Sequence, residues 1–141
     1  MSLWIIDTDH LSLLQRGHLG IRKQITTRKP QEIAINIISA EEQIRGRLSI
    51  IRRAISANEI VLYYRQLKEL LDDIATINVL DFTPEASLIY EDLVRQKIRI
   101  GTRDLRIAAL VLAVKGTVVT RNQRDFNKVP GLKVEDWTVE G

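Results

Sequence analysis

The stretch that most constrains the fold is residues 100–126, IGTRDLRIAALVLAVKGTVVTRNQRDF. Between Leu105 and Val114 all residues but one are apolar, which is too much for the single apolar stripe of a surface helix. The sequence therefore predicts a helix buried on most sides. Lys115-Gly116 is expected to end it, with the glycine in the left-handed cap conformation. The β-branched run 117–120 is expected to form a short core strand.

Two carboxylates flank this predicted helix and strand. Asp104 falls in the first turn of the helix, and Asp125 follows the strand after a polar loop. A buried helix that leads into a core strand can bring both acids to one rim of a sheet. Other acidic residues that reach the same rim would then form one cluster with them.

The remaining sequence alternates short apolar strands with helical segments, ending in an edge strand. The expected strands are residues 3–6, 33–37, 77–82, 117–120 and 132–137. Expected helices run from Asp9 to about Leu14, on to about Thr27, from Ser39, from Asn58, and from Pro84 behind a Thr83 cap. This alternation predicts an α/β sandwich with a mainly parallel central sheet, in one domain spanning residues 1–141.

Composition limits the chemistry that such a fold can carry. The chain has no cysteine and only two histidines, His10 and His18, which are expected at the surface without a role. Disulfides, thiolate zinc sites and histidine-rich metal sites are thereby excluded. A bound metal would be held by carboxylates, which favours hard cations such as Mg²⁺ or Mn²⁺. The net charge of +3 permits a polyanionic partner without requiring one.

Acidic residues follow the predicted strands at the ends where α/β sheets place their sites. They are Asp7 and Asp9 after the first strand, Glu41 and Glu42 after the second, Asp81 at the third, and Asp125 after the fourth, with Asp104 at the preceding helix start. Clustered carboxylates repel one another unless a cation or a proton lies among them. Several at one rim therefore indicate a divalent metal site, which could activate water and stabilise charge on a phosphoryl group.

Each acid also has an ordinary structural explanation. Asp7 could end a strand, and Ser39-x-x-Glu42 could be a helix capping box. Asp104 favours a helix N-terminus through the helix dipole alone, and Asp125 could cap a loop. Taken singly these explanations are the simpler ones. A shared position at one sheet rim is what distinguishes a site from four unrelated acids.

Four segments carry a resemblance to the PIN-domain ribonucleases of the VapC toxin type. They are residues 4–8 (WIIDT), 42–46 (EQIRG), 104–109 (DLRIAA) and 120–126 (TRNQRDF), and the ending PGL…EDW is also similar. The resemblance covers essentially the whole chain. It implies a three-layer α/β/α fold and a Mg²⁺- or Mn²⁺-dependent endoribonuclease that cleaves RNA by metal-activated water.

The resemblance also implies roles for particular residues and partners. The acidic set that holds the metal would be Asp7, Glu42, Asp104 and Asp125. The residues that support this set would be Thr8, Thr120 and Asn122. Basic residues around the rim would contact RNA, namely Arg103, Arg106, Arg121 and Arg124, beside Arg99 and Lys128. Members of this family are homodimers neutralised by a cognate antitoxin. No apolar run is long enough to span a bilayer, so the expected location is the cytoplasm.

Several alternatives stay open in the sequence. Glu41 rivals Glu42, although the spacing to Gly46 favours Glu42. Asp9 could cap a helix or reach a metal through water. The segment Asp7-Thr8-Asp9 is also close to the first motif of haloacid-dehalogenase-like phosphatases, except that Leu11 replaces the expected Thr or Val. A catalytically silent PIN-like module that binds RNA or a protein is a third reading.

Overall fold

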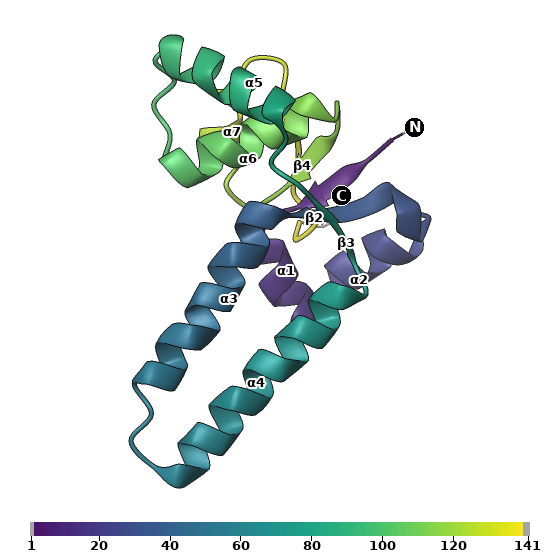
Figure 1. Cartoon of the computed structure of the whole chain (residues 1–141). Coiled ribbons are helices and arrows are strands. Elements are labelled where there is room, and N and C mark those ends of the chain that lie inside the picture. The colour runs from purple at the N-terminus through teal and green to yellow at the C-terminus, as the bar shows by residue number, and fades with distance from the viewer. Residues whose placement is uncertain (1, 140–141) are drawn as a thin grey trace.

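The computed structural model describes residues 2–139, which form one five-stranded sheet with helices packed around it (Figure 1). The strands are β1 (Trp4–Ile6), β2 (Ile33–Asn36), β3 (Asn78–Leu80), β4 (Thr117–Val119) and β5 (Lys133–Glu135). Their order is β3-β2-β1-β4-β5, and every pairing is parallel. The predicted α/β sandwich with a parallel sheet is confirmed, and β5 is an edge strand as expected.

The helices account for most of the remaining chain. They are α1 (Thr8–Gln15), α2 (Leu19–Thr26), α3 (Ile37–Arg52), α4 (Ala57–Ala75), α5 (Pro84–Arg95), α6 (Thr102–Ala113) and α7 (Gln123–Phe126), with a short 3₁₀ turn η1 (Pro30–Glu32) before β2. Thr83 caps α5 through the backbone N–H of Ala86, as the sequence predicts. Across residues 2–139, no helix is both long and apolar enough to cross a membrane.

Two apolar cores lie on opposite faces of the sheet, because neighbouring strand residues point to opposite sides. Ile5 and Val118 belong to the core under α5, α6 and α7, whereas Ile6 and Val119 belong to the core against α1 and α2. The α6 segment that the sequence marks as buried contributes Leu105, residues 107–109 and Val111 to the first core. This gives the expected three layers.

The helices α3 and α4 form an antiparallel hairpin that extends beyond the sheet (Figure 1). Only Leu70 is fully buried on α4, whereas Ile60, Val61 and Tyr64 are exposed. The apolar side chains of α4 are therefore only partly covered within this chain. The hairpin presents apolar surface to its surroundings.

Two helices begin earlier than predicted, because another residue caps each of them. Asp7 rather than Asp9 caps α1, and Asn36 rather than Ser39 caps α3, which begins at Ile37 and removes the proposed Ser39–Glu42 capping box. In both places the residue that directly follows the strand takes the cap, because the chain turns from strand to helix without a loop.

The expectation that both histidines are idle surface residues is wrong. His10 is fully buried; its Nδ1 lies 2.7 Å from Asp9 Oδ1, and its Nε2 accepts a hydrogen bond from the backbone N–H of Trp137 at 3.0 Å. His18 caps α2 by accepting from the backbone N–H of Ile21 at 3.2 Å. His10 thus ties α1 to the segment that follows the edge strand.

The turn after α6 also differs from the prediction, and it supports a test. Lys115 rather than Gly116 takes the left-handed conformation, with φ of 55°. Gly116 is instead required by close packing: a Cβ there would lie 2.4 Å from Ile5 Cδ1 and 2.9 Å from the Leu3 carbonyl oxygen. The backbone oxygen cannot move aside as a flexible side chain would, so the β1–β4 junction would have to shift.

Replacing Gly116 by Ala should therefore destabilise the protein by about 1–3 kcal/mol. The measurement is urea unfolding followed by circular dichroism. Gly46→Ala is the matched control, because a Cβ at Gly46 meets nothing within 4 Å and alanine favours its helix. A Gly116→Ala variant as stable as the parent would show that the junction has more room than the structure indicates.

Candidate active site

The first acid of the site, Asp7, follows β1 directly and is almost completely buried. Its Oδ1 accepts from the backbone N–H of Thr8 at 2.7 Å and from the Ser39 hydroxyl at 3.3 Å, and its Oδ2 accepts from the Thr120 hydroxyl at 3.0 Å. These donors come from the ends of β1 and β4 and from the start of α3. The carboxylate is therefore fixed in place by groups from three segments distant in sequence.

Asp104 and Asp125 share a single amide. The Nδ2 of Asn122 donates to Asp104 Oδ2 at 3.0 Å and to Asp125 Oδ2 at 3.1 Å. Asp104 lies in the first turn of α6, whereas Asp125 lies in α7 beyond β4. The structure thus places these two acids at the same rim, where the helix-to-strand connection was expected to bring them.

Glu42 joins this group through Arg103. The Arg103 guanidinium approaches three carboxylates: its Nη1 lies 3.3 Å from Asp7 Oδ1, its Nε 2.9 Å from Glu42 Oε2, and its Nη2 2.6 Å from Asp104 Oδ1. The rival Glu41 points elsewhere and pairs with Arg45 on the exposed face of α3 at 2.6 Å. Only Glu42 of the adjacent pair therefore lies at the rim.

The electrostatic setting differs among the acids. Burial raises the pKa of Asp104 above the ordinary carboxyl value, and the charges of Asp7 and Asp125 add to this effect against the opposing charge of Arg103. The hydrogen bond from Asn122 lowers the pKa of Asp125. The two carboxylates that share Asn122 are therefore shifted in opposite directions, and Asp104 is the one whose charge the fold disfavours.

The donor chemistry of this rim fits a hard divalent cation. All four acids offer oxygen ligands, which Mg²⁺ and Mn²⁺ prefer. The buried Oδ1 of Asp104 has no well-aligned hydrogen-bond donor even though the Arg103 Nη2 is close, so it retains acceptor capacity. Within residues 2–139, however, no three His, Cys, Asp or Glu side chains are already arranged to hold a metal ion. Arg103 and Asn122 stand among the carboxylates instead.

The other predicted site residues fall into two groups. Thr8, Thr120 and Asn122 contact the acids or Arg103 directly, with the Thr8 hydroxyl 3.3 Å from Arg103 Nη1. Among the basic residues, Arg121 and Arg124 are exposed, and Arg124 lies 3.5 Å from Asp125 Oδ1. The guanidinium of Arg106 lies over the ring of Tyr90. Lys128 lies 3.6 Å from Asp125 Oδ1 and donates to the carbonyl of Arg99.

Asp9 is not the residue that caps α1. Its Oδ1 pairs with His10, and its Oδ2 accepts from the backbone N–H of Arg121 at 3.2 Å. Asp9 therefore anchors the loop after β4, which carries Asn122 and Asp125. Asp81 is exposed beyond β3, and its side chain has no hydrogen bond or ion pair with the described part of the chain.

Two buried polar residues of the rim were not predicted as site residues. Ser39 donates to Asp7, and Asn36 fixes Ser39 by accepting from its backbone N–H at 2.7 Å. The signal was present in the sequence, because Asn36 ends β2 and Ser39 follows it, at the same sheet end as Asp7. The sequence pattern of Ser39 was interpreted as a capping box, so its contact with Asp7 was not predicted.

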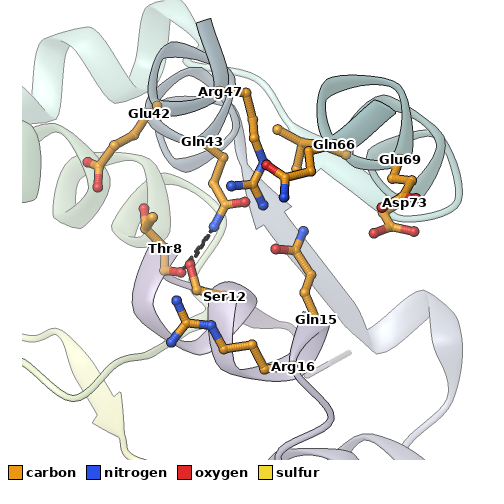
Figure 2. A pocket seen from close by; sticks show the side chains of 12 residues that line it. Thr8, Ser12, Gln15, Arg16, Glu42, Gln43, Arg47, Gln66, Glu69 and Asp73 are labelled. Atoms are coloured by element: carbon orange, nitrogen blue, oxygen red, sulfur yellow. Dashed lines mark hydrogen bonds between the residues drawn. The ribbon is translucent and has the colours of Figure 1, made fainter. Parts of the chain in front are cut away.

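A polar pocket of about 430 Å³ adjoins the acids and shares Thr8 and Glu42 with them. Figure 2 shows Gln15, Gln43 and Gln66 directed into it from α1, α3 and α4, with Arg47 among them. Gln43 donates to the Ser12 hydroxyl at 2.7 Å, whereas the buried Gln15 Nε2 and Arg47 Nε have no hydrogen-bond partner within residues 2–139. The pocket is thus lined by polar side chains next to Thr8 and Glu42.

Comparisons with known proteins agree with this geometry. The family model described as PIN domain matches residues 5–132. The chain is 32% identical over 68 residues to ribonuclease VapC2 of Rickettsia felis, which is 45% of this chain and 51% of that protein. It is 34% identical over 68 residues to the tRNA(fMet)-specific endonuclease VapC of Salmonella typhimurium, which is 45% of this chain and 52% of that protein. The matched segments thus span about half the length of these relatives.

A solved structure is similar over nearly the whole fold. A chain of DNA-bound VapBC from Salmonella typhimurium superposes with a TM-score of 0.77 at 24% identity, covering 97% of this chain and 99% of that chain. At this identity the likeness concerns the fold. It extends across the α3–α4 hairpin as well as the sheet.

Proposed function

The chain belongs to the PIN-domain family, and from that premise we propose that it is a divalent-metal-dependent endoribonuclease, the toxin of a toxin–antitoxin pair. One observation carries the proposal: four acids from different elements meet around one guanidinium and one amide at the carboxyl end of the sheet. Its relatives named above are a ribonuclease and a tRNA endonuclease, which indicates RNA as the substrate.

In this proposal Asp7, Asp104 and Asp125 would hold Mg²⁺ or Mn²⁺, with Glu42 as a further ligand, directly or through water. The bound cation supplies activation of water and neutralises charge that builds on a phosphoryl group. Thr120 and Ser39 keep Asp7 in a single orientation, and Asn122 keeps Asp104 and Asp125 facing each other. These contacts orient the individual carboxylates, while the Arg103 guanidinium that lies between three of the acids would have to move for a cation to reach them.

The substrate would be held by charge and by the polar pocket. Arg103 and Arg124 lie beside the acids, and Arg121 is exposed on the loop that carries Asn122, so all three could bind backbone phosphates. RNA affinity should therefore fall as salt rises. The polar side chains that line the pocket, among them Gln43 and Gln66, suit polar groups of a nucleotide. Arg106 faces Tyr90 instead and is the weakest of the predicted RNA contacts.

The test is incubation of the protein with RNA and with a phosphomonoester, each in Mg²⁺, Mn²⁺ or EDTA. We expect internal cleavage of RNA with either metal, none in EDTA, and no release from the monoester. Hydrolysis of the monoester alone would favour the phosphatase reading, although Asp9, its second acid, is already engaged by His10 and Arg121. Metal-independent RNA binding without cleavage would indicate a silent module.

The α3–α4 hairpin supports the proposed partners. The sequence does not show which helices form a dimer interface, and α6 is largely covered by the chain's own core. Helix α4 carries several exposed apolar side chains, including Val61, Leu62 and Tyr64. We propose a cytoplasmic homodimer of a single PIN-like domain, with apolar surface left for a cognate antitoxin.

Light scattering at micromolar concentration should give the mass of two chains. Replacing Val61 and Leu62 by Ser should shift the protein toward the monomer if α4 forms the interface, because the substitution removes apolar area that only association would bury. A parent protein that is monomeric under these conditions would reject the dimer.

A further inference from the structure

Arg103 holds the central position in the acidic cluster. It is the second residue of α6, yet its side chain reaches carboxylates from the end of β1, from α3 and from α6 itself. The distances of 3.3, 2.9 and 2.6 Å engage all three nitrogens of the guanidinium. No other basic side chain of residues 2–139 forms an ion pair with more than one of the four acids.

One positive charge among three carboxylates offsets their mutual repulsion. The effect is reciprocal: partial burial acts to lower the pKa of Arg103, but the charges of Asp7, Asp104 and Glu42 outweigh it and raise that pKa. The oxygens that Arg103 contacts are also those that a hard cation would take. Two cations cannot share Asp7 Oδ1 and Asp104 Oδ1 at full contact, so they must compete for them.

We propose that Arg103 is an internal counter-cation, which a divalent metal displaces, and which then turns to the rim and binds an RNA phosphate. The inference rests on the proposed function of this site. The Arg103 side chain is 38% exposed, so solvent lies beside it and it can leave the cluster without unfolding α6. Outside the cluster, its planar guanidinium suits a phosphate group.

The test is calorimetric titration with Mn²⁺ of the parent, Arg103→Met, Arg103→Lys and the control Arg106→Met. Removing the competing charge should lower the Mn²⁺ Kd of Arg103→Met about tenfold. The Mn²⁺ Kd of Arg103→Lys should lie between those of Arg103→Met and the parent, because lysine keeps the charge but lacks the planar guanidinium that contacts three acids. Arg106→Met removes the same charge from the same helix, away from the cluster, and should leave the Kd within about twofold.

A second readout separates this role from a merely structural one. Without metal, Arg103→Met should melt below the parent, because the carboxylates lose their shared partner, and Mn²⁺ should raise its melting temperature more than it raises the parent's. In cleavage assays the Mn²⁺ concentration for half-maximal rate should fall while the KM for RNA rises. A variant with only a structural defect should instead need more Mn²⁺ for half-maximal rate and also show a higher KM for RNA.

The outcomes distinguish this inference from the proposed function. Suppose that the parent binds Mn²⁺ and cleaves RNA, but Arg103→Met binds Mn²⁺ no more tightly than the parent. The counter-cation role of Arg103 would then be rejected, and the proposed nuclease function would stand. A parent that binds no divalent cation would overturn both.

Discussion

Replacing Asp104 by Asn should nearly abolish RNA cleavage while leaving the metal-free protein as stable as the parent or more stable. The substitution keeps the size of the side chain and an oxygen that can accept from Asn122, but it removes one charge. If Asp104 holds the cation, the cleavage rate should fall by at least about a hundredfold, since even groups that only orient metal ligands cost about 10–100-fold.

The stability change has the opposite sign from that of an ordinary helix-start residue. The pKa of Asp104 is raised in the folded state by burial, so the fold favours the protonated form, and the ionised form contributes no stability at neutral pH. Arg103 loses one partner in the variant but keeps Asp7 and Glu42. A residue that acted only through the helix dipole would instead cost about 0.3–1 kcal/mol and leave cleavage intact.

Cleavage at limiting Mg²⁺ and metal-free thermal melting measure the two effects. Asp72→Asn is the matched control: it makes the same chemical change on exposed α4, where Asp72 pairs with Lys68, and should retain the parent rate. An Asp104→Asn variant that cleaves at the parent rate would remove Asp104 from the site.

The second large effect is expected in the core beneath the site. Phe126 is fully buried, packs in the core under α5 and α6, and directly follows Asp125 in the four-residue helix α7. So short a helix is held in place by this anchor rather than by its own hydrogen bonds. Phe126→Ala should therefore lower the free energy of unfolding by about 3–5 kcal/mol.

Urea unfolding measures this loss. The control is Arg124→Ala, two residues earlier in α7, whose side chain is 87% exposed and whose replacement should change stability by no more than about 0.5 kcal/mol. A cost below about 1 kcal/mol for Phe126→Ala would mean that α7 and Asp125 are positioned by other contacts.

Much of the fold follows from local sequence. Short apolar runs separated by helical periods predict parallel strands, and the parallel arrangement in turn predicts that residues after β1 and β4 meet at one rim. If β1 and β4 are neighbours in the sheet, Asp7, Asp104 and Asp125 are expected at the same rim, which is where the structure places them. The buried character of α6 follows from its composition alone.

The errors share a physical origin in competition between neighbours. Asp7 and Asp9, or Asn36 and Ser39, are equally good helix caps by residue type, and the end of the preceding strand decides between them. Gly116 has the residue type of a left-handed cap, but Ile5 and Leu3 require its lack of a Cβ, and Lys115 takes the strained conformation.

Long-range pairing explains the other misses. His10 is buried because it accepts from Trp137, 127 residues later in the chain, and nothing in the local sequence marks that contact. The sequence placed Arg103 at the rim but did not predict its ion pairs with Asp7 and Glu42, which depend on how β1 and α3 are brought beside α6. Such contacts follow from tertiary structure and not from residue type.

The most direct test of the account is cleavage of one end-labelled RNA by the purified protein under reversible metal removal. With Mg²⁺ we expect internal cuts in the RNA, and with excess EDTA we expect intact RNA. When Mg²⁺ is restored above the chelator concentration, the same cuts should appear again. Undiminished cleavage in EDTA would contradict a carboxylate metal site as the source of the activity.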